Sequence, residues 1–116
     1  MYLSLLHKFC IFQVNVRSLL QSIDDVKLLC DEKKPDVFVV TESWLDASVS
    51  DNKVTIPDYS ILQNDRNRHS GGVAVYFKSS RKATLVTSVC RSQVESLWLS
   101  LSGGLKPSST VLYACY

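Results

Sequence analysis

The chain has 116 residues, a length that suits one domain and excludes two of ordinary size. A hydrophobic share of 46% and a charged share of 21% exclude a chain that is disordered by composition. The formal net charge of +2 is too small to indicate a nucleic-acid partner, although it allows one where the basic residues cluster.

Cysteine usage indicates a reducing compartment. None of the cysteines is spaced as C-x-x-C and no histidine pair accompanies them, which argues against a zinc site. An even number would allow disulfides, but all of them lie in apolar stretches, where a free thiol behaves as a small hydrophobic side chain. The four are Cys10, Cys30, Cys90 and Cys115. We therefore expect free thiols and an intracellular location, in the nucleus or the cytoplasm.

Residues 1–12 are apolar enough to suggest a signal peptide. His7 and Lys8 interrupt the run, no positive cluster precedes it, and no small-residue cleavage pattern follows it. No stretch of the chain approaches the ~20 apolar residues of a membrane span. We expect neither a signal peptide nor a transmembrane helix.

The first expected strand runs from Phe9 to Val14 and ends on Asn15. Asn15 is either a turn residue that closes the strand or a polar ligand at its carboxyl end. A helix is expected next, with Ser22 as its N-cap, Asp25 in the capping-box position and Pro35 as its stop. Its buried stripe comprises Ile23, Val26, Leu29 and Cys30, and its solvated face Asp24, Asp25, Asp31 and Glu32.

The stretch from Pro35 to Leu45 predicts a second strand that is buried on both faces. A proline is not tolerated inside a helix, and Val37 to Val40 form a continuous apolar run. Glu42 follows this run, and it is either a metal ligand or a solvated loop residue beside the core. If the two strands are parallel neighbours, Asn15 and Glu42 end on the same edge of the sheet. That convergence is the first functional signal in the sequence.

The remaining residues predict strands joined by polar connections. Residues 46–58 are expected to form a surface connection with a short helix or turn, and residues 64–72 a basic loop that ends in two glycines. Strands are expected at Tyr59–Gln63, Val73–Phe77, 84–90, Glu95–Leu101 and Val111–Cys115. Because Tyr116 follows the last strand directly, we expect a truncated domain.

Several short motifs occur in a defined order along residues 9–116. They are Asn15-Val16-Arg17-Ser18-Leu19, Lys34-Pro35-Asp36-Val37, Thr41-Glu42-Ser43-Trp44-Leu45, Ile56-Pro57-Asp58-Tyr59, Asp65-Arg66-Asn67-Arg68, Gly71-Gly72-Val73-Ala74-Val75-Tyr76 and Glu95-Ser96-Leu97-Trp98-Leu99. Each motif alone is weak. Together the chain resembles the N-terminal half of the endonuclease domain of non-long-terminal-repeat (LINE-type) retrotransposons, which belongs to the endonuclease/exonuclease/phosphatase superfamily.

The resemblance implies an α/β fold that forms part of a four-layer sandwich. Residues 1–116 would be one truncated domain, a mixed β-sheet with one main helix packed on it and about half of the four layers. Most of the second sheet would lie in the missing half. One face of the first sheet would then lack its partner layer, and an exposed apolar face of that kind requires a partner.

The resemblance also implies roles for particular residues. Glu42 would bind Mg²⁺, with Mn²⁺ as an alternative, and Asn15 would organise the metal and the phosphate. Tyr116 falls at the position of a tyrosine that hydrogen-bonds the scissile phosphate. The DNA contacts would be Arg17, Arg66 and Arg68, for which a solvated loop is an equally good interpretation.

The implied activity is magnesium-dependent nicking of DNA to prime reverse transcription, with DNA and a downstream reverse transcriptase as partners. The aspartate, asparagine and histidine groups of the later family motifs lie beyond residue 116, and neither His7 nor His69 replaces them, so we expect a catalytically incomplete chain. Two alternatives remain open. The first is a non-catalytic remnant that acts as an interaction module, and the second is a phosphoesterase of the same superfamily that acts on lipid head groups.

Overall fold

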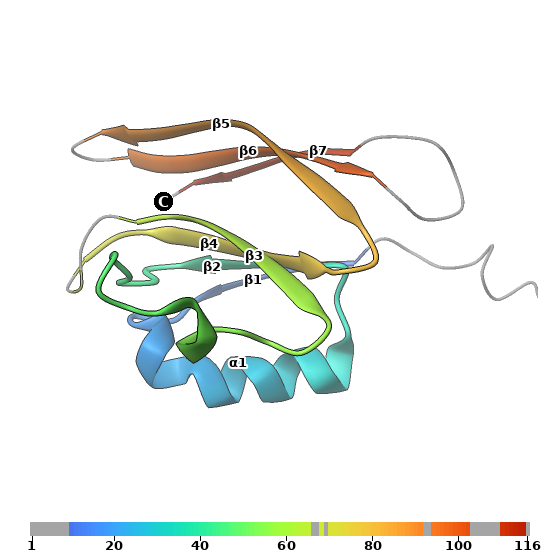
Figure 1. Cartoon of the computed structure of the whole chain (residues 1–116), viewed down its shortest axis with the longest axis horizontal. Coiled ribbons are helices and arrows are strands. Elements are labelled where there is room, and N and C mark those ends of the chain that lie inside the picture. The colour runs from blue at the N-terminus through green and yellow to red at the C-terminus, as the bar shows by residue number, and fades with distance from the viewer. Residues whose placement is uncertain (1–9, 66–67, 69, 92–93, 103–109, 116) are drawn as a thin grey trace, which may run out of the picture.

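The computed structural model describes residues 10–65, 68, 70–91, 94–102 and 110–115. They form helix α1, a mixed four-stranded sheet of order β1-β2-β4-β3 and a three-stranded sheet of order β5-β6-β7 (Figure 1). The elements are β1 (Ile11–Asn15), α1 (Leu19–Lys33), β2 (Val37–Thr41), η2 (Asp51–Lys53), β3 (Tyr59–Asn64), β4 (Val73–Lys78), β5 (Lys82–Arg91), β6 (Val94–Ser102) and β7 (Thr110–Cys115). Every strand expected from the sequence is present, and so are the helix and the short helical turn between residues 46 and 58.

Strand β2 is the centre of the four-stranded sheet, and all five of its residues are buried. It pairs in parallel with β1 and antiparallel with β4. Phe38 and Val40 belong to the core cluster that includes the apolar stripe of α1, whereas Val37 and Val39 belong to a second cluster with residues of β4. The prediction of a strand buried on both faces is therefore confirmed. Each of these buried side chains contributes roughly 1.5–3 kcal/mol relative to its exposed state.

Helix α1 begins earlier than the sequence predicted. Its N-cap is Ser18, whose Oγ accepts a hydrogen bond from the backbone N–H of Gln21 at 3.4 Å, and the expectation of Ser22 as the cap is wrong. The reason is tertiary, because the backbone N–H groups of Ser18 and Leu19 donate to the loop after β2 and hold the turn directly after β1. The predicted stripe is confirmed, since Val26 and Cys30 are buried in the core.

The other face of the four-stranded sheet is covered. Its apolar residues on β2 and β4 are 0–7% exposed, and the sheet β5-β6-β7 lies over them in Figure 1. The expectation that this face lacks a partner layer is wrong, because three strands of the second sheet are already present in this chain. The residues that form this face are Val37, Val39, Val73, Val75 and Phe77. Within the described residues, no helix is long and apolar enough to cross a lipid bilayer.

A buried carboxylate joins the strands at the end of the sheet where β2 begins. Asp36 is 1% exposed and its Oδ2 accepts from the backbone N–H of Cys10 at 2.8 Å. Its Oδ1 lies 3.2 Å from Nη2 of Arg81 and 3.7 Å from Nζ of Lys78. Asp36 thus connects the residue before β1 with β2, the end of β4 and the residue before β5.

We expect Asp36→Asn to lower the free energy of unfolding by about 3 kcal/mol, because it leaves two partly buried cations without their counter-charge. Urea unfolding measures the change. Asp31→Asn, at an exposed position of α1, is the matched control and should shift the free energy by less than about 0.5 kcal/mol. Equal unfolding midpoints for the two variants would show that Asp36 is not a stabilising ion-pair partner.

Candidate functional site

The carboxyl ends of β1, β2 and β3 lie at one edge of the four-stranded sheet, which we call the rim. The first two strands are parallel, and β3 has the same direction because both β2 and β3 pair antiparallel with β4. The register places Asn15 opposite Thr41, so the next residue, Glu42, leaves the sheet beside Asn15. Ligands of open α/β sheets collect at such an edge.

Three chain segments are joined at the rim by backbone hydrogen bonds. The turn after β1 donates to the loop after β2, and this loop in turn donates to the glycine pair before β4. The bonds are Val16 N to Thr41 O (3.1 Å), Ser18 N to Glu42 O (2.9 Å), Leu19 N to Ser43 O (2.9 Å), Ser43 N to Gly72 O (3.3 Å) and Trp44 N to Gly71 O (3.1 Å). Glycine suits the last two positions, since Gly71 and Gly72 have φ of 69° and 92°.

The backbone of the rim is strained. Four non-glycine residues there have positive φ: Arg17 (48°), Ser18 (95°), Glu42 (58°) and Trp44 (54°). Such conformations cost roughly 1–3 kcal/mol each and persist where the surroundings enforce them, as they often do at functional sites. The backbone bonds between the three segments supply that enforcement. Two further non-glycine residues with positive φ, Lys34 (49°) and Asp58 (71°), lie at the opposite end of the sheet, so the rim carries most but not all of this strain.

The side chain of Glu42 is half-buried and held by a neighbour. Trp44 donates its indole Nε1–H to Oε2 of Glu42 at 2.5 Å. Arg68 in turn donates from Nε to the backbone carbonyl of Trp44 at 3.0 Å. The sequence carries no signal of this hydrogen bond, because nothing in the spacing of residues 42 and 44 shows that both have left-handed backbone.

The polar groups at the rim suit a hydrated magnesium ion. Glu42 offers carboxylate oxygen and the exposed Asn15 offers amide oxygen, and Mg²⁺ prefers oxygen and needs only one or two protein carboxylates. Among the residues that the structure describes, no three His, Cys, Asp or Glu side chains gather as a metal cage. Ser43, beside Glu42, is fully buried, and its Oγ is the one buried side-chain polar atom in the described part that has no hydrogen-bond partner. Such an atom is typical of a site whose polar partners are incomplete.

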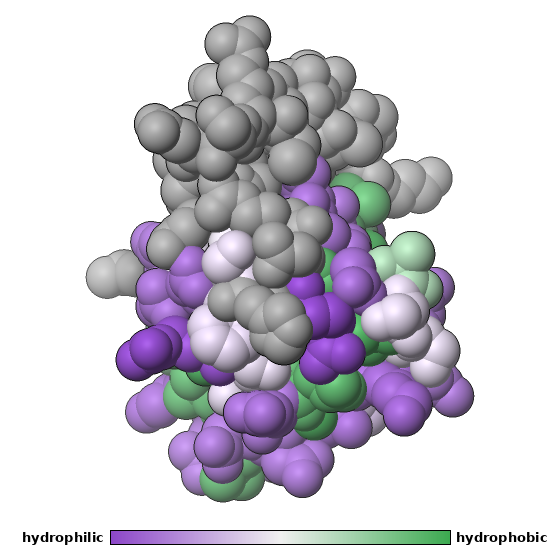
Figure 2. Space-filling model, turned by 90° about the vertical axis from the view of Figure 1, so that its left-hand side faces the viewer, coloured by the Kyte–Doolittle hydropathy of each residue, from purple (hydrophilic) through white to green (hydrophobic). Residues whose placement is uncertain are grey.

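The arginines and the tyrosine predicted from the sequence have different outcomes. Arg17 is exposed at the rim, and Arg68 reaches it through the bond to Trp44. Arg66 and Tyr116 lie outside the described residues, as do His7 and His69. Strand β7 ends on the rim side of the molecule in Figure 1. Figure 2 looks onto that side, and the described surface is mostly hydrophilic with scattered hydrophobic patches.

Asp65, just after β3, also belongs to the rim. Gln63 donates through Nε2 to both of its carboxylate oxygens, at 3.0 and 2.9 Å. Burial, and then the negative charge of Asp46, raise the pKa of Asp65, while the hydrogen bonds from Gln63 oppose that change. The sequence placed Asp65 in a basic polar loop and gave no signal that its carboxyl group is partly desolvated.

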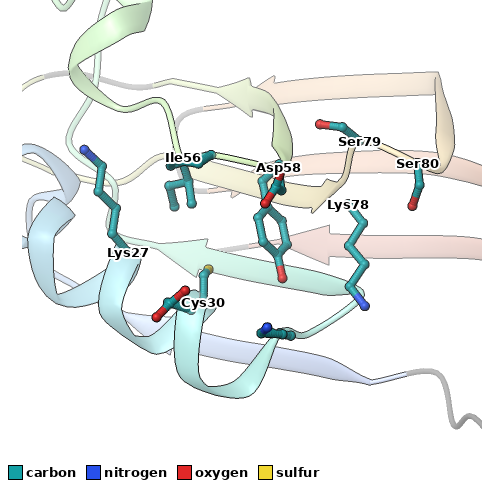
Figure 3. Close-up of a pocket in the computed structure, with 11 residues that line it drawn as sticks. Lys27, Cys30, Ile56, Asp58, Lys78, Ser79 and Ser80 are labelled. Atoms are coloured by element: carbon teal, nitrogen blue, oxygen red, sulfur yellow. The ribbon is translucent and has the colours of Figure 1, made fainter.

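A cavity of about 580 Å³ lies at the opposite end of the sheet (Figure 3). Helix α1 contributes Lys27 and Cys30 to it, the segment before β3 contributes Ile56 and Asp58, and the end of β4 contributes Lys78. Its lining carries three lysines and two aspartates, so the charges nearly balance. The cavity therefore lies at the other end of the strands from Asn15 and Glu42.

Two groups of this cavity, the thiol of Cys30 and the hydroxyl of Tyr59, are poor catalysts at neutral pH. Burial raises the pKa of the free Cys30 thiol to about 11, so the reactive thiolate is absent at neutral pH. Burial, followed by smaller electrostatic effects, raises the pKa of Tyr59 to about 12, and its hydroxyl donates to the carbonyl of Pro35 at 2.6 Å. We therefore place the candidate site at the rim and not in this cavity.

Tyr59→Phe should lose about 1 kcal/mol of stability at neutral pH, because the hydrogen bond to Pro35 is removed. In the unfolded chain the phenol ionises near its ordinary pKa of 10, whereas the folded chain holds the proton to about 12. Wild-type stability consequently falls as pH rises between these values, and the difference between wild type and Tyr59→Phe should shrink there. Urea midpoints across that range test this. Ser79→Ala, which loses a hydrogen bond to Ser60 but no titratable group, should keep a constant difference.

No protein-family model matches the sequence, and no curated protein matches it. Solved structures do match. An AP endonuclease from Leishmania major has a TM-score of 0.69 and 19% identity over 93% of this chain and 40% of its own. A mannosyl-6-phosphatase from Bacteroides thetaiotaomicron has a TM-score of 0.67 and 12% identity over 93% of this chain and 51% of its own.

A protein of the same bacterium described as belonging to the endonuclease/exonuclease/phosphatase family has a TM-score of 0.66 and 12% identity over 92% of this chain and 48% of its own. The chain thus spans about two fifths to a half of the length of these solved structures. At such identities the likeness establishes the fold. The described part of this chain has the α/β fold of endonuclease/exonuclease/phosphatase proteins, represented over part of their length.

Proposed function

We propose that this chain is part of a magnesium-dependent phosphodiesterase that cuts DNA, of the retrotransposon endonuclease type. The observation that carries the proposal is the parallel register of β1 and β2, which puts Asn15 and Glu42 side by side in the sheet order at one strained rim. Its support is the motif order described above and the fold shared with an AP endonuclease. Residues 1–116 are proposed to form one domain. Its proposed partners are DNA and the rest of the parent protein, and its proposed location is the nucleus or the cytoplasm.

The electrostatics of the rim favour a phosphate. The N-terminal end of α1 follows Asn15 by a few residues, and its first turn contains no acidic side chain that would neutralise the positive end of the helix dipole. Arg17, the residue before the N-cap of α1, adds an exposed positive charge. Phosphate contacts require only positive charge and reach, so Arg17, Arg66 and Arg68 are proposed to hold the DNA backbone and Asn15 and Tyr116 the reacting phosphate.

Glu42 is proposed to hold Mg²⁺, or Mn²⁺ in its place. When bound, the metal would polarise the phosphoryl oxygen and stabilise the leaving alkoxide. Glu42 and Asn15 would orient the metal and the phosphate relative to each other. We assign none of the described rim residues as the group that activates the attacking water, and the similar structures extend well beyond the matched part. We propose that complete hydrolysis needs residues of the parent protein beyond these 116.

Glu42→Gln should weaken Mg²⁺ or Mn²⁺ binding at least about tenfold, because replacing even a group that supports a metal ligand typically costs ~10–100-fold in affinity. Isothermal titration calorimetry of the whole chain measures it. Glu32→Gln removes the same charge from an exposed position of α1 and should bind as the wild type does. Absence of saturable binding, or equal affinities for the two variants, would contradict the metal site and favour a non-catalytic interaction module.

A plasmid-nicking assay tests the proposal that these 116 residues are catalytically incomplete. With Mg²⁺ and supercoiled DNA, we expect no nicking by these residues that depends on Glu42. Robust nicking that disappears in Glu42→Gln would support the metal site and refute the proposed incompleteness. Because a mannosyl-6-phosphatase shares the fold, phosphate release from sugar phosphates and phosphoinositides should be measured in parallel, and Glu42-dependent release would favour a phosphoesterase acting on head groups.

A further inference from the structure

We propose that Trp44 is a positioning residue, whose indole N–H holds the Glu42 carboxylate in one orientation for the metal. The inference deepens the proposed function and depends on it, because it assigns a support to the same metal site. Trp44 itself need not touch the metal or the DNA. The observation is the hydrogen bond from Nε1 of Trp44 to Oε2 of Glu42 at 2.5 Å.

The contact depends on an unusual backbone. Glu42 and Trp44 are two residues apart, and both have left-handed φ, 58° and 54°. In an extended strand, side chains two residues apart lie on the same face, but this geometry does not bring their polar end groups within hydrogen-bond distance. Here the loop folds back on itself, and the large indole meets the carboxylate. The left-handed backbone at Glu42 and Trp44 thus accompanies the hydrogen bond between their side chains, and Glu42 is the proposed metal ligand.

The chemistry of the pair suits a supporting role. An indole is a donor only, so it constrains the carboxylate without competing for the metal. A donor bonded to an ionised carboxylate makes a charge-assisted bond, which is short and directional. A free glutamate side chain has large rotamer freedom, and a partner that limits this freedom before the ligand arrives reduces the entropy lost on binding.

The backbone of Trp44 is itself held on both sides. Its N–H donates to the carbonyl of Gly71 at 3.1 Å, and its carbonyl accepts from Nε of Arg68 at 3.0 Å. Both partners come from the segment between β3 and β4. Arg68 therefore acts on Glu42 through Trp44, a role that differs from the DNA contact expected from the sequence and that is measurable without DNA.

The competing explanation is that the Trp44 ring only packs at the rim. Trp44→Phe separates the two, because phenylalanine keeps an aromatic ring and lacks the N–H donor. Trp44→His keeps a ring N–H donor and is the rescue variant, and the double variant Glu42→Gln/Trp44→His controls for direct binding of the metal by the histidine. Tyr59→Phe is the matched control, since it removes one aromatic hydrogen-bond donor at the opposite end of the same sheet.

The first experiment follows the Trp44 indole signal in ¹H–¹⁵N spectra of the whole chain. The chain has two tryptophans, and the Trp44 signal is assigned by triple-resonance methods. We expect Glu42→Gln to shift this signal and to speed the exchange of its proton with solvent. Paramagnetic Mn²⁺ should broaden the signal in wild type and leave it sharp in Glu42→Gln. If Glu42→Gln leaves the chemical shift and the exchange rate of the indole proton unchanged, the proposed contact is overturned, even if Trp44→Phe fails to fold.

The second experiment measures Mn²⁺ affinity by electron paramagnetic resonance. We expect Trp44→Phe to bind about tenfold more weakly, Trp44→His to recover part of the loss, and Arg68→Gln to show a smaller loss in the same direction. Tyr59→Phe should bind as wild type does. If folded Trp44→Phe binds Mn²⁺ as tightly as wild type does while Glu42→Gln binds it more weakly, the positioning role of Trp44 is overturned and the metal site is retained. Absence of Glu42-dependent binding in wild type would overturn the proposed function as well.

Discussion

The parallel pairing of β1 and β2 is the constraint on which the candidate site depends. Parallel neighbours cannot be joined by a tight turn, so α1 must cross over the sheet and return the chain to the same starting edge. Both strands then end at one rim, with Asn15 opposite Thr41 and Glu42 immediately after it. Hydrogen bonds hold this register at both ends of the pair, from Cys10 N–H to Oδ2 of the buried Asp36 before the strands and from Val16 N–H to the carbonyl of Thr41 after them.

The two ends of the sheet serve different physical purposes. At the starting edge, Asp36 joins several strands through charged and backbone partners, and burial raises the pKa values of Cys30 and Tyr59 in the neighbouring cavity. At the rim, the backbone is strained at Glu42 and Trp44 and held by bonds to the glycine pair before β4. Unfavourable backbone geometry of this kind persists where the surrounding structure enforces it.

The fold alone does not decide the chemistry, since similar structures include an endonuclease and a phosphatase. What the rim adds is a carboxylate, an amide, a helix N-terminus without acidic side chains in its first turn and an exposed arginine. These groups suit a hydrated divalent cation and a phosphate ester in general. The bond between Trp44 and Glu42 makes the carboxylate the best-supported side chain of the set.

The sequence by itself determined the order and type of the elements, because the stripe at Val26 and Cys30 has the helical period, whereas the apolar run Val37–Val40 is short, rich in valine and preceded by Pro35. It also predicted that Asn15 and Glu42 follow neighbouring strands. Tertiary structure alone decided where α1 begins, that the second sheet covers the first, and that Trp44 donates to Glu42. Each of these depends on hydrogen bonds or packing between segments distant along the chain, or on left-handed backbone that such bonds enforce, and local residue patterns carry no record of them.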